Sequence, residues 1–157
     1  MDAQKSFDAN PRFLVTTPEA QNTTPSGACD CGEVKLSEHE KLLQEWQNRL
    51  GLQDWRIKLA DNCVPDEMTL PDVAGDFICT ESNKTARIEM LDPMFYGERI
   101  VPFDWEKTLV HELLHLKLCL VSENVDDLQA RYMHQIIDDL ARAFVDAKRV
   151  KNLEETE

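Results

Sequence analysis

The sequence has few basic residues relative to its acidic ones and no long apolar run. Thirty Asp and Glu residues against 17 Lys and Arg residues give a formal net charge of −13 at pH 7. Such a charge repels DNA and RNA. No stretch approaches the roughly 20 apolar residues that span a bilayer, and the chain does not start with the basic and then apolar segments of a signal peptide. The composition therefore predicts no nucleic-acid partner, no membrane insertion and no secretion.

Cysteine is scarce, and its pattern does not suggest disulfides. The five cysteines are an odd number and are widely spaced, unlike the even, clustered sets of small secreted domains. The C-x-C pair of Cys29 and Cys31 lacks the second pair that a structural zinc site needs, so we interpret it as two thiols in a tail. We therefore expect reduced thiols and a cytoplasmic protein.

The length allows one domain. A chain of 157 residues, 42% of them hydrophobic, can form one core but is too short for two domains. Residues 1–36 are rich in Pro, Gly, Asn, Thr and Ser and show little apolar periodicity, which predicts a flexible N-terminal extension. We expect one folded domain over 37–150 and a charged C-terminal tail over 151–157.

Apolar periodicity predicts three helices and three short strands in an antiparallel or mixed sheet. The first two helices are expected at 38–50, after Ser37, and at 104–121, after a cap at Asp104. Asn124 is expected to cap a last long helix that frays from Lys148 onward. The expected strands are 55–59, 86–90 and, with a weaker pattern, 73–80.

The second predicted helix contains the sequence HELLH at residues 111–115. Residues four apart on a helix are rotated by about 40° and separated by about 6 Å along the axis, so His111 and His115 can bind one ion. Glu112 is turned by about 100° from His111, which keeps it off the ion but close to a water bound there. Zinc lowers the pKa of such a water and polarises a carbonyl group. We predict Zn²⁺ on the two histidines and Glu112 as general base, whereas the fourth histidine, His39, is expected to be solvated.

A catalytic zinc takes three protein ligands and leaves one position open. The metzincin pattern would continue with Gly and His where this chain has Leu118 and Val121, so that class is excluded. His134, on the last predicted helix, is our preferred third ligand, and Glu123 in the turn between the helices is the alternative. Asp138 follows on the same face as His134 and is predicted to accept the free N–H of a ligating histidine.

This layout resembles a known class of metallopeptidase. HELLH, an 18-residue gap and a ligand-x-x-x-Asp pattern are similar to the gluzincins, with His134 standing where that family has glutamate. The stretch from Trp46 to Lys148, with WRIKL, TLVHELLHL and DDLARAF, also looks like small metallopeptidases carried by phages and prophages. The resemblance implies a minimal zincin-like α+β fold. In that fold a small sheet of three or slightly more strands packs on the active-site helix, with an N-terminal helix and a long C-terminal helix.

The leading hypothesis is hydrolysis of a peptide bond in a peptide or protein substrate, with one Zn²⁺ per chain. One alternative is a catalytically inactive, zinc-stabilised module that binds a partner protein in a phage-related role, with four protein ligands on the metal. Another is a metal-free helical interaction protein. The strand at 86–90 is a candidate for edge pairing with an extended substrate, and Tyr96 or Tyr132 is a candidate hydrogen-bond donor to the oxyanion. The sequence leaves the oligomeric state open.

Overall fold

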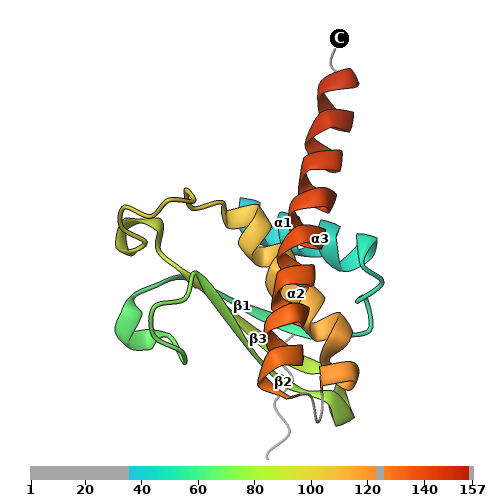
Figure 1. The fold of residues 1–157 in the computed structure, drawn as a ribbon. Coiled ribbons are helices and arrows are strands. Elements are labelled where there is room, and N and C mark those ends of the chain that lie inside the picture. Colours follow the sequence, from blue (N-terminus) through green and yellow to red (C-terminus); the bar gives the residue numbers. More distant parts are fainter. Residues whose placement is uncertain (1–35, 123–125, 156–157) are drawn as a thin grey trace, which may run out of the picture. The chain divides into compact units, whose positions relative to one another are not determined.

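The computed structural model describes residues 36–122 and 126–155. Nearly all of the expected N-terminal extension, as well as Glu123 and Asn124, therefore lies outside the described residues. Within them the chain forms an α+β fold with a three-stranded sheet and three α-helices (Figure 1). The helices are α1 (Glu38–Arg49), α2 (Trp105–Ser122) and α3 (Asp127–Glu154), and the strands are β1 (Arg56–Cys63), β2 (Gly75–Thr80) and β3 (Thr85–Leu91). None of these helices combines the length and the apolar character needed to cross a bilayer.

The sheet is mixed, and its strand order is β1-β3-β2. β2 pairs antiparallel with β3, to which a short connection joins it, whereas β1 pairs parallel with β3. β3 is therefore the central strand, with both of its edges occupied. The prediction that the strand at 86–90 offers a free edge was wrong, because the parallel pairing of β1 covers that edge. Of the described strands, β2 is the outer strand on the side of α2.

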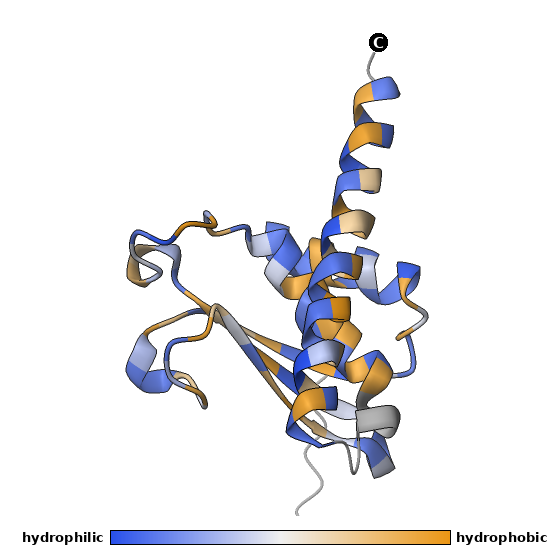
Figure 2. Cartoon of the chain, viewed as in Figure 1, coloured by the Kyte–Doolittle hydropathy of each residue, from blue (hydrophilic) through white to orange (hydrophobic). Residues whose placement is uncertain are grey.

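α2 lies at the centre of the packing and contacts the sheet, α1 and α3. Apolar residues lie on several of its sides, as expected for a helix that packs against more than one neighbour, and Figure 2 shows apolar residues along its length. Its side chains pack against the apolar face of β3 and against one face of α3. The fully buried residues of this core include Ile88, Met90, Leu109, Val110, Leu113, Ile137 and Val145. Each large side chain stabilises the fold by about 1.5 to 3 kcal/mol through its removal from water.

Side-chain caps fix where the helices begin. The Ser37 hydroxyl accepts from the Glu40 N–H in a capping box at α1, and Asp104 accepts from the Lys107 N–H at 3.2 Å at the start of α2. α3 is capped by Asp126, which accepts from Gln129 N–H at 2.8 Å. The prediction of Asn124 as this cap was wrong, because the carboxylate two residues later takes that role.

The second half of α3 is held to the rest of the fold by an ion-pair network that includes one buried lysine. Lys148 is only 9% exposed and donates to Glu45 and to Glu106, each at 2.7 Å. Arg149 binds both oxygens of Asp104, at 2.8 and 2.9 Å. The prediction that the helix frays from Lys148 onward was wrong, because Lys148 and Arg149 are held by partners on α1 and at the start of α2, and α3 continues to Glu154 with its last residues exposed.

His39 is likewise not the solvated residue that the sequence suggested. Its ring stacks on Trp105 with 3.8 Å between ring centroids, and its Nδ1 contacts Asp61. The other oxygen of Asp61 accepts from Trp105 Nε1 at 3.1 Å. This cluster ties the start of α1 to β1 and to the first residue of α2, so it helps to fix the position of α2.

Replacing Lys148 with alanine is expected to lower the free energy of unfolding by roughly 3 kcal/mol, because the half-buried carboxylates of Glu45 and Glu106 would lose a charged partner. Urea denaturation followed by tryptophan fluorescence measures this change. Lys151→Ala is the matched control, since Lys151 is 70% exposed in its pair with Glu155, and an exposed pair is worth under about 1 kcal/mol. Equal effects of the two substitutions would show that the Lys148 network does not hold α3 in place.

Candidate metal centre

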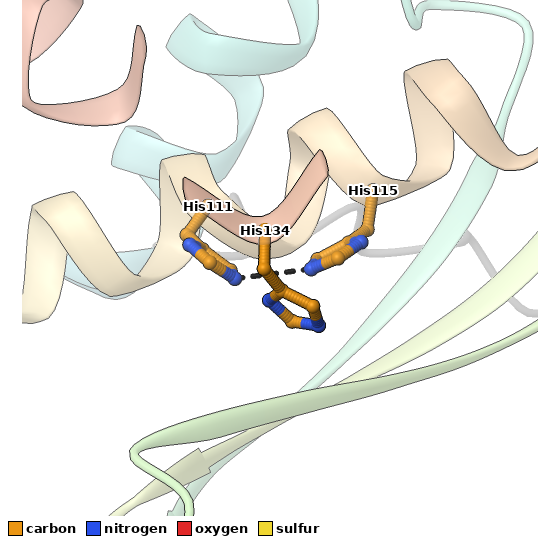
Figure 3. Close-up of side chains that lie close together, drawn as sticks. All are labelled: His111, His115 and His134. Carbon is orange, nitrogen blue, oxygen red and sulfur yellow. Dashed lines mark hydrogen bonds between the residues drawn. The ribbon is translucent and has the colours of Figure 1, made fainter. Parts of the chain in front are cut away.

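The structure brings three histidines together from two helices. His111 and His115 lie one turn apart on α2, and His134 lies on the first half of α3, which packs along α2. Figure 3 shows the three imidazole rings converging on one point. One nitrogen from each ring lies within 4.8 Å of the other two, and His111 Nε2 and His115 Nε2 are 3.0 Å apart. The His134 ring lies with its centroid 4.5 Å from that of His115.

This donor set fits a zinc ion. Zinc binds imidazole nitrogen at about 2.0 to 2.1 Å, so nitrogens around a tetrahedral ion lie about 3.3 Å apart. A ligating histidine must be neutral. Burial lowers the pKa of His115 to about 4, with further lowering by His111 and His134, and burial also lowers the pKa of His111. The lone pairs of these two rings are therefore available at neutral pH.

Asp138 fixes the orientation of one of the rings. Its Oδ1 lies 2.8 Å from His111 Nδ1, so the Nδ1–H of His111 donates to the carboxylate. The lone pair is then placed on Nε2, the nitrogen that faces His115. This is the contact that the sequence analysis expected of Asp138. Phe77 of β2 supports a second ring, since it stacks on His115 with 5.3 Å between centroids and an interplanar angle of 16°.

Glu112 points into the space between α2 and β2, where it is only 6% exposed. The backbone of β2 passes close to it at Gly75. A Cβ atom at that position would lie 3.0 Å from Glu112 Oε1 and 2.8 Å from Thr108 Cγ2. Burial, together with the charges of Asp76 and Asp138, raises the pKa of Glu112 to about 8. A divalent cation on the neighbouring histidines would act in the opposite direction and favour the carboxylate.

The histidines and Glu112 line one cavity of about 660 Å³. Its walls are α2, the first half of α3, the edge strand β2 and the loop at 92–104 that leads into α2. The wall residues contributed by β2 and by the charged helix faces were not predicted from the sequence. These residues are Gly75, Asp76, Phe77, Lys107 and Arg142. The period-two pattern at 73–80 predicted a strand, but nothing in that pattern indicates that the strand lies beside α2.

The two tyrosines that are candidate donors to the oxyanion lie in different places. Tyr96 lines the cavity and packs against Phe103 with 5.1 Å between ring centroids. Tyr132 is 59% exposed and does not line this cavity. Glu123, the alternative metal ligand, lies outside the described residues. The candidate centre therefore consists of three histidines, one carboxylate that contacts a histidine and one buried carboxylate beside them.

Comparisons with models of known protein families, with characterised proteins and with solved structures found no match to this chain. The chemistry of the cavity is therefore inferred from its own residues.

The raised pKa of Glu112 predicts a pH-dependent stability of the metal-free protein. Its ordinary pKa is 4.5 and its pKa in the fold is about 8, so between these values the folded state holds one more proton than the unfolded state. The stability then falls as the pH rises. Below pH 6.5 the lowered pKa values of His111 and His115 act in the opposite direction, because their stabilising effect is lost as the pH falls.

Above pH 6.5 the effect of Glu112 outweighs the opposing effect of the two histidines, which fades as the unfolded histidines lose their protons, and the net loss of stability between pH 6.5 and pH 8 is roughly 1 kcal/mol. Urea denaturation of chelator-treated protein at pH 6.5 and pH 8 measures this loss. Glu112→Gln is the control, since it cannot titrate and should lose much less stability over this range. An equal loss in both proteins would show that another group is responsible.

Proposed function

We propose that this chain is a zinc-dependent peptidase with a minimal zincin-like fold, in which His111, His115 and His134 hold one Zn²⁺. The observation that carries the proposal is the convergence of three imidazoles beside a buried carboxylate in a cavity large enough for part of a peptide. Three histidine ligands leave one coordination position for water or substrate. Two resemblances support the same proposal: HELLH with the 18-residue gap to His134 is similar to the gluzincin layout, and the stretch from Trp46 to Lys148 looks like small metallopeptidases of phages and prophages.

The residues around the metal site would each have a separate role in hydrolysis. The ion, when bound, supplies a Lewis acid that polarises a carbonyl group and lowers the pKa of water. Glu112 would accept a proton from the attacking water and give it to the leaving amide nitrogen. Asp138 keeps His111 in the correct tautomer and Phe77 keeps the ring of His115 in place. The backbone at Gly75 covers Glu112 and limits its access to bulk water.

We further propose that an extended substrate pairs with the edge of β2. This strand lies beside α2, and its residues Gly75, Asp76 and Phe77 line the cavity. Edge pairing gives affinity through main-chain hydrogen bonds and holds a peptide straight across the site. β2 thereby takes the role that the sequence analysis gave to the strand at 86–90, which is β3 in the centre of the sheet.

The test is a metal analysis coupled to an activity assay. The protein is purified without a metal-binding tag, its metals are measured by elemental analysis, and cleavage of a mixed library of fluorogenic peptides is followed before and after chelation. We expect one zinc per chain, cleavage that chelation abolishes and recovery when zinc is restored. Bound zinc without cleavage of any library member would favour the inactive binding module. No zinc binding, even after zinc is added, would favour a metal-free interaction protein.

A further inference from the structure

Two loops beside the cavity expose large apolar side chains. The loop between β1 and β2 carries Leu70, which is 51% exposed, and the loop between β3 and α2 carries Val101, which is 65% exposed. Both residues line the same cavity as the histidines, together with Tyr96 and Phe103. We call these four residues the apolar mouth. Figure 2 shows apolar stretches on both loops.

The two loops are tied to each other. The guanidinium of Arg99 donates from both terminal nitrogens to the carbonyl of Asp72, at 3.3 Å each, and lies over the ring of Tyr96, with 4.6 Å from its central carbon to the ring centroid. Arg99 therefore bridges the loop that carries Leu70 to the loop that carries Val101. Clustered apolar side chains at the surface of an acidic protein indicate an interaction site, and here the cluster is continuous with the candidate metal centre.

The distance between the mouth and the histidines determines which residue of a bound peptide would contact the mouth. The loop of Val101 and Phe103 runs into the start of α2 at Asp104, and His111 lies seven residues further along the helix, which corresponds to about 10 Å. An extended chain covers about 3.3 Å per residue, so this separation is about three residues of substrate. The mouth is thus too far away to receive a side chain next to the scissile bond.

The direction of β2 determines whether the mouth contacts the substrate on the N-terminal or the C-terminal side of the scissile bond. Gly75 lies against Glu112 and Phe77 against His115, so β2 and α2 run in the same direction, and the mouth lies beyond the N-terminal end of β2. A peptide paired antiparallel to β2, the slightly more stable arrangement, runs the opposite way. Its C-terminal half therefore leads from the histidines to the mouth.

We propose that the cleft selects peptides that carry a bulky apolar side chain about three residues to the C-terminal side of the scissile bond. This inference rests on the proposed peptidase function. Leu70 and Val101 would contact that side chain. Arg99 would keep the two loops far enough apart for the side chain to enter between them. A protein segment that exposes Leu, Ile, Phe or Met in an extended region is the substrate class that fits this mouth.

The experiment uses fluorogenic peptides that share one cleavable sequence and differ only in the third residue after the scissile bond. We expect kcat/KM for Leu or Phe at this position to exceed that for Asp or Ser by about 10- to 100-fold, as for burial of a side chain in an apolar pocket. Val101→Asp should reduce this ratio to within a few-fold of one. Ile100→Asp is the matched control, since Ile100 is fully exposed in the same loop and does not line the cavity, and it should leave the ratio unchanged.

The outcomes separate this inference from the proposed function. Cleavage that is indifferent to the third residue, or that depends on the third residue to the N-terminal side instead, overturns the inference and leaves the peptidase assignment standing. If no peptide is cleaved, the peptidase assignment fails, and fluorescence anisotropy of the labelled peptides on zinc-loaded Glu112→Gln then tests the mouth directly. Tighter binding of the apolar peptides that Val101→Asp abolishes supports the mouth as a recognition site, whereas equal binding of all peptides overturns it.

Discussion

Replacing Glu112 with glutamine is expected to reduce peptide hydrolysis by about a thousandfold or more while the protein keeps one zinc ion per chain. General-base catalysis by a positioned side chain contributes about 10²- to 10⁴-fold. Glutamine has the shape of the acid but cannot accept the proton from water. The three histidines are left intact, so the metal should stay. The comparison is kcat/KM on one peptide cleaved by the parent, with zinc measured by elemental analysis on the same preparations.

The same substitution should not harm the fold, which makes the result interpretable. In the metal-free protein the raised pKa of Glu112 means that the folded state prefers the neutral side chain at pH 7, and glutamine is a permanently neutral analogue. We therefore expect unchanged circular dichroism and equal or higher stability at pH 8. Glu154→Gln, on an exposed residue at the end of α3, controls for the loss of one negative charge. An active, zinc-loaded Glu112→Gln would show that another group activates the water.

The secondary structure could be predicted because it depends on local patterns. Apolar residues at helical spacing identified α1 and α2 within one or two residues, and alternation identified β1 and β3. The strand order could not be predicted, because the parallel pairing of β1 with β3 joins segments separated by the whole of β2. For the same reason the sequence did not reveal that β2, with Gly75, covers Glu112.

The candidate site shows the same division between local and long-range information. His111, Glu112 and His115 are placed by helix geometry alone, and Asp138 follows from its spacing of one turn after His134. The contact of His134 with the other two histidines depends on how α3 packs along α2. The only sequence feature that indicated this packing is the short connection between the two helices. The burial of Lys148 could not be foreseen, since its partners Glu45 and Glu106 are far away in the sequence.

Replacing His134 with alanine is expected to weaken zinc binding by about 100-fold or more. A structural zinc with four ligands is bound with about 10 to 16 kcal/mol, so each ligand supplies on the order of 3 kcal/mol. Asp138→Ala should cost less, about 10- to 100-fold, because this carboxylate orients a ligand without binding the ion. The measurement is a competition titration against a chromophoric chelator. Gln135→Ala, an exposed neighbour on α3, should leave zinc affinity unchanged.

The titration also decides between the two zinc-dependent functions when Glu123→Ala is added to it. Loss of affinity with His134→Ala and none with Glu123→Ala gives three protein ligands and an open coordination position, as a peptidase requires. Loss of affinity with Glu123→Ala and none with His134→Ala would show that Glu123 is the third ligand and that His134 does not bind the ion. If both substitutions weaken binding as strongly as loss of a ligand should, four protein groups surround the ion. No position for water then remains, and the zinc-stabilised binding module becomes the better description of the protein.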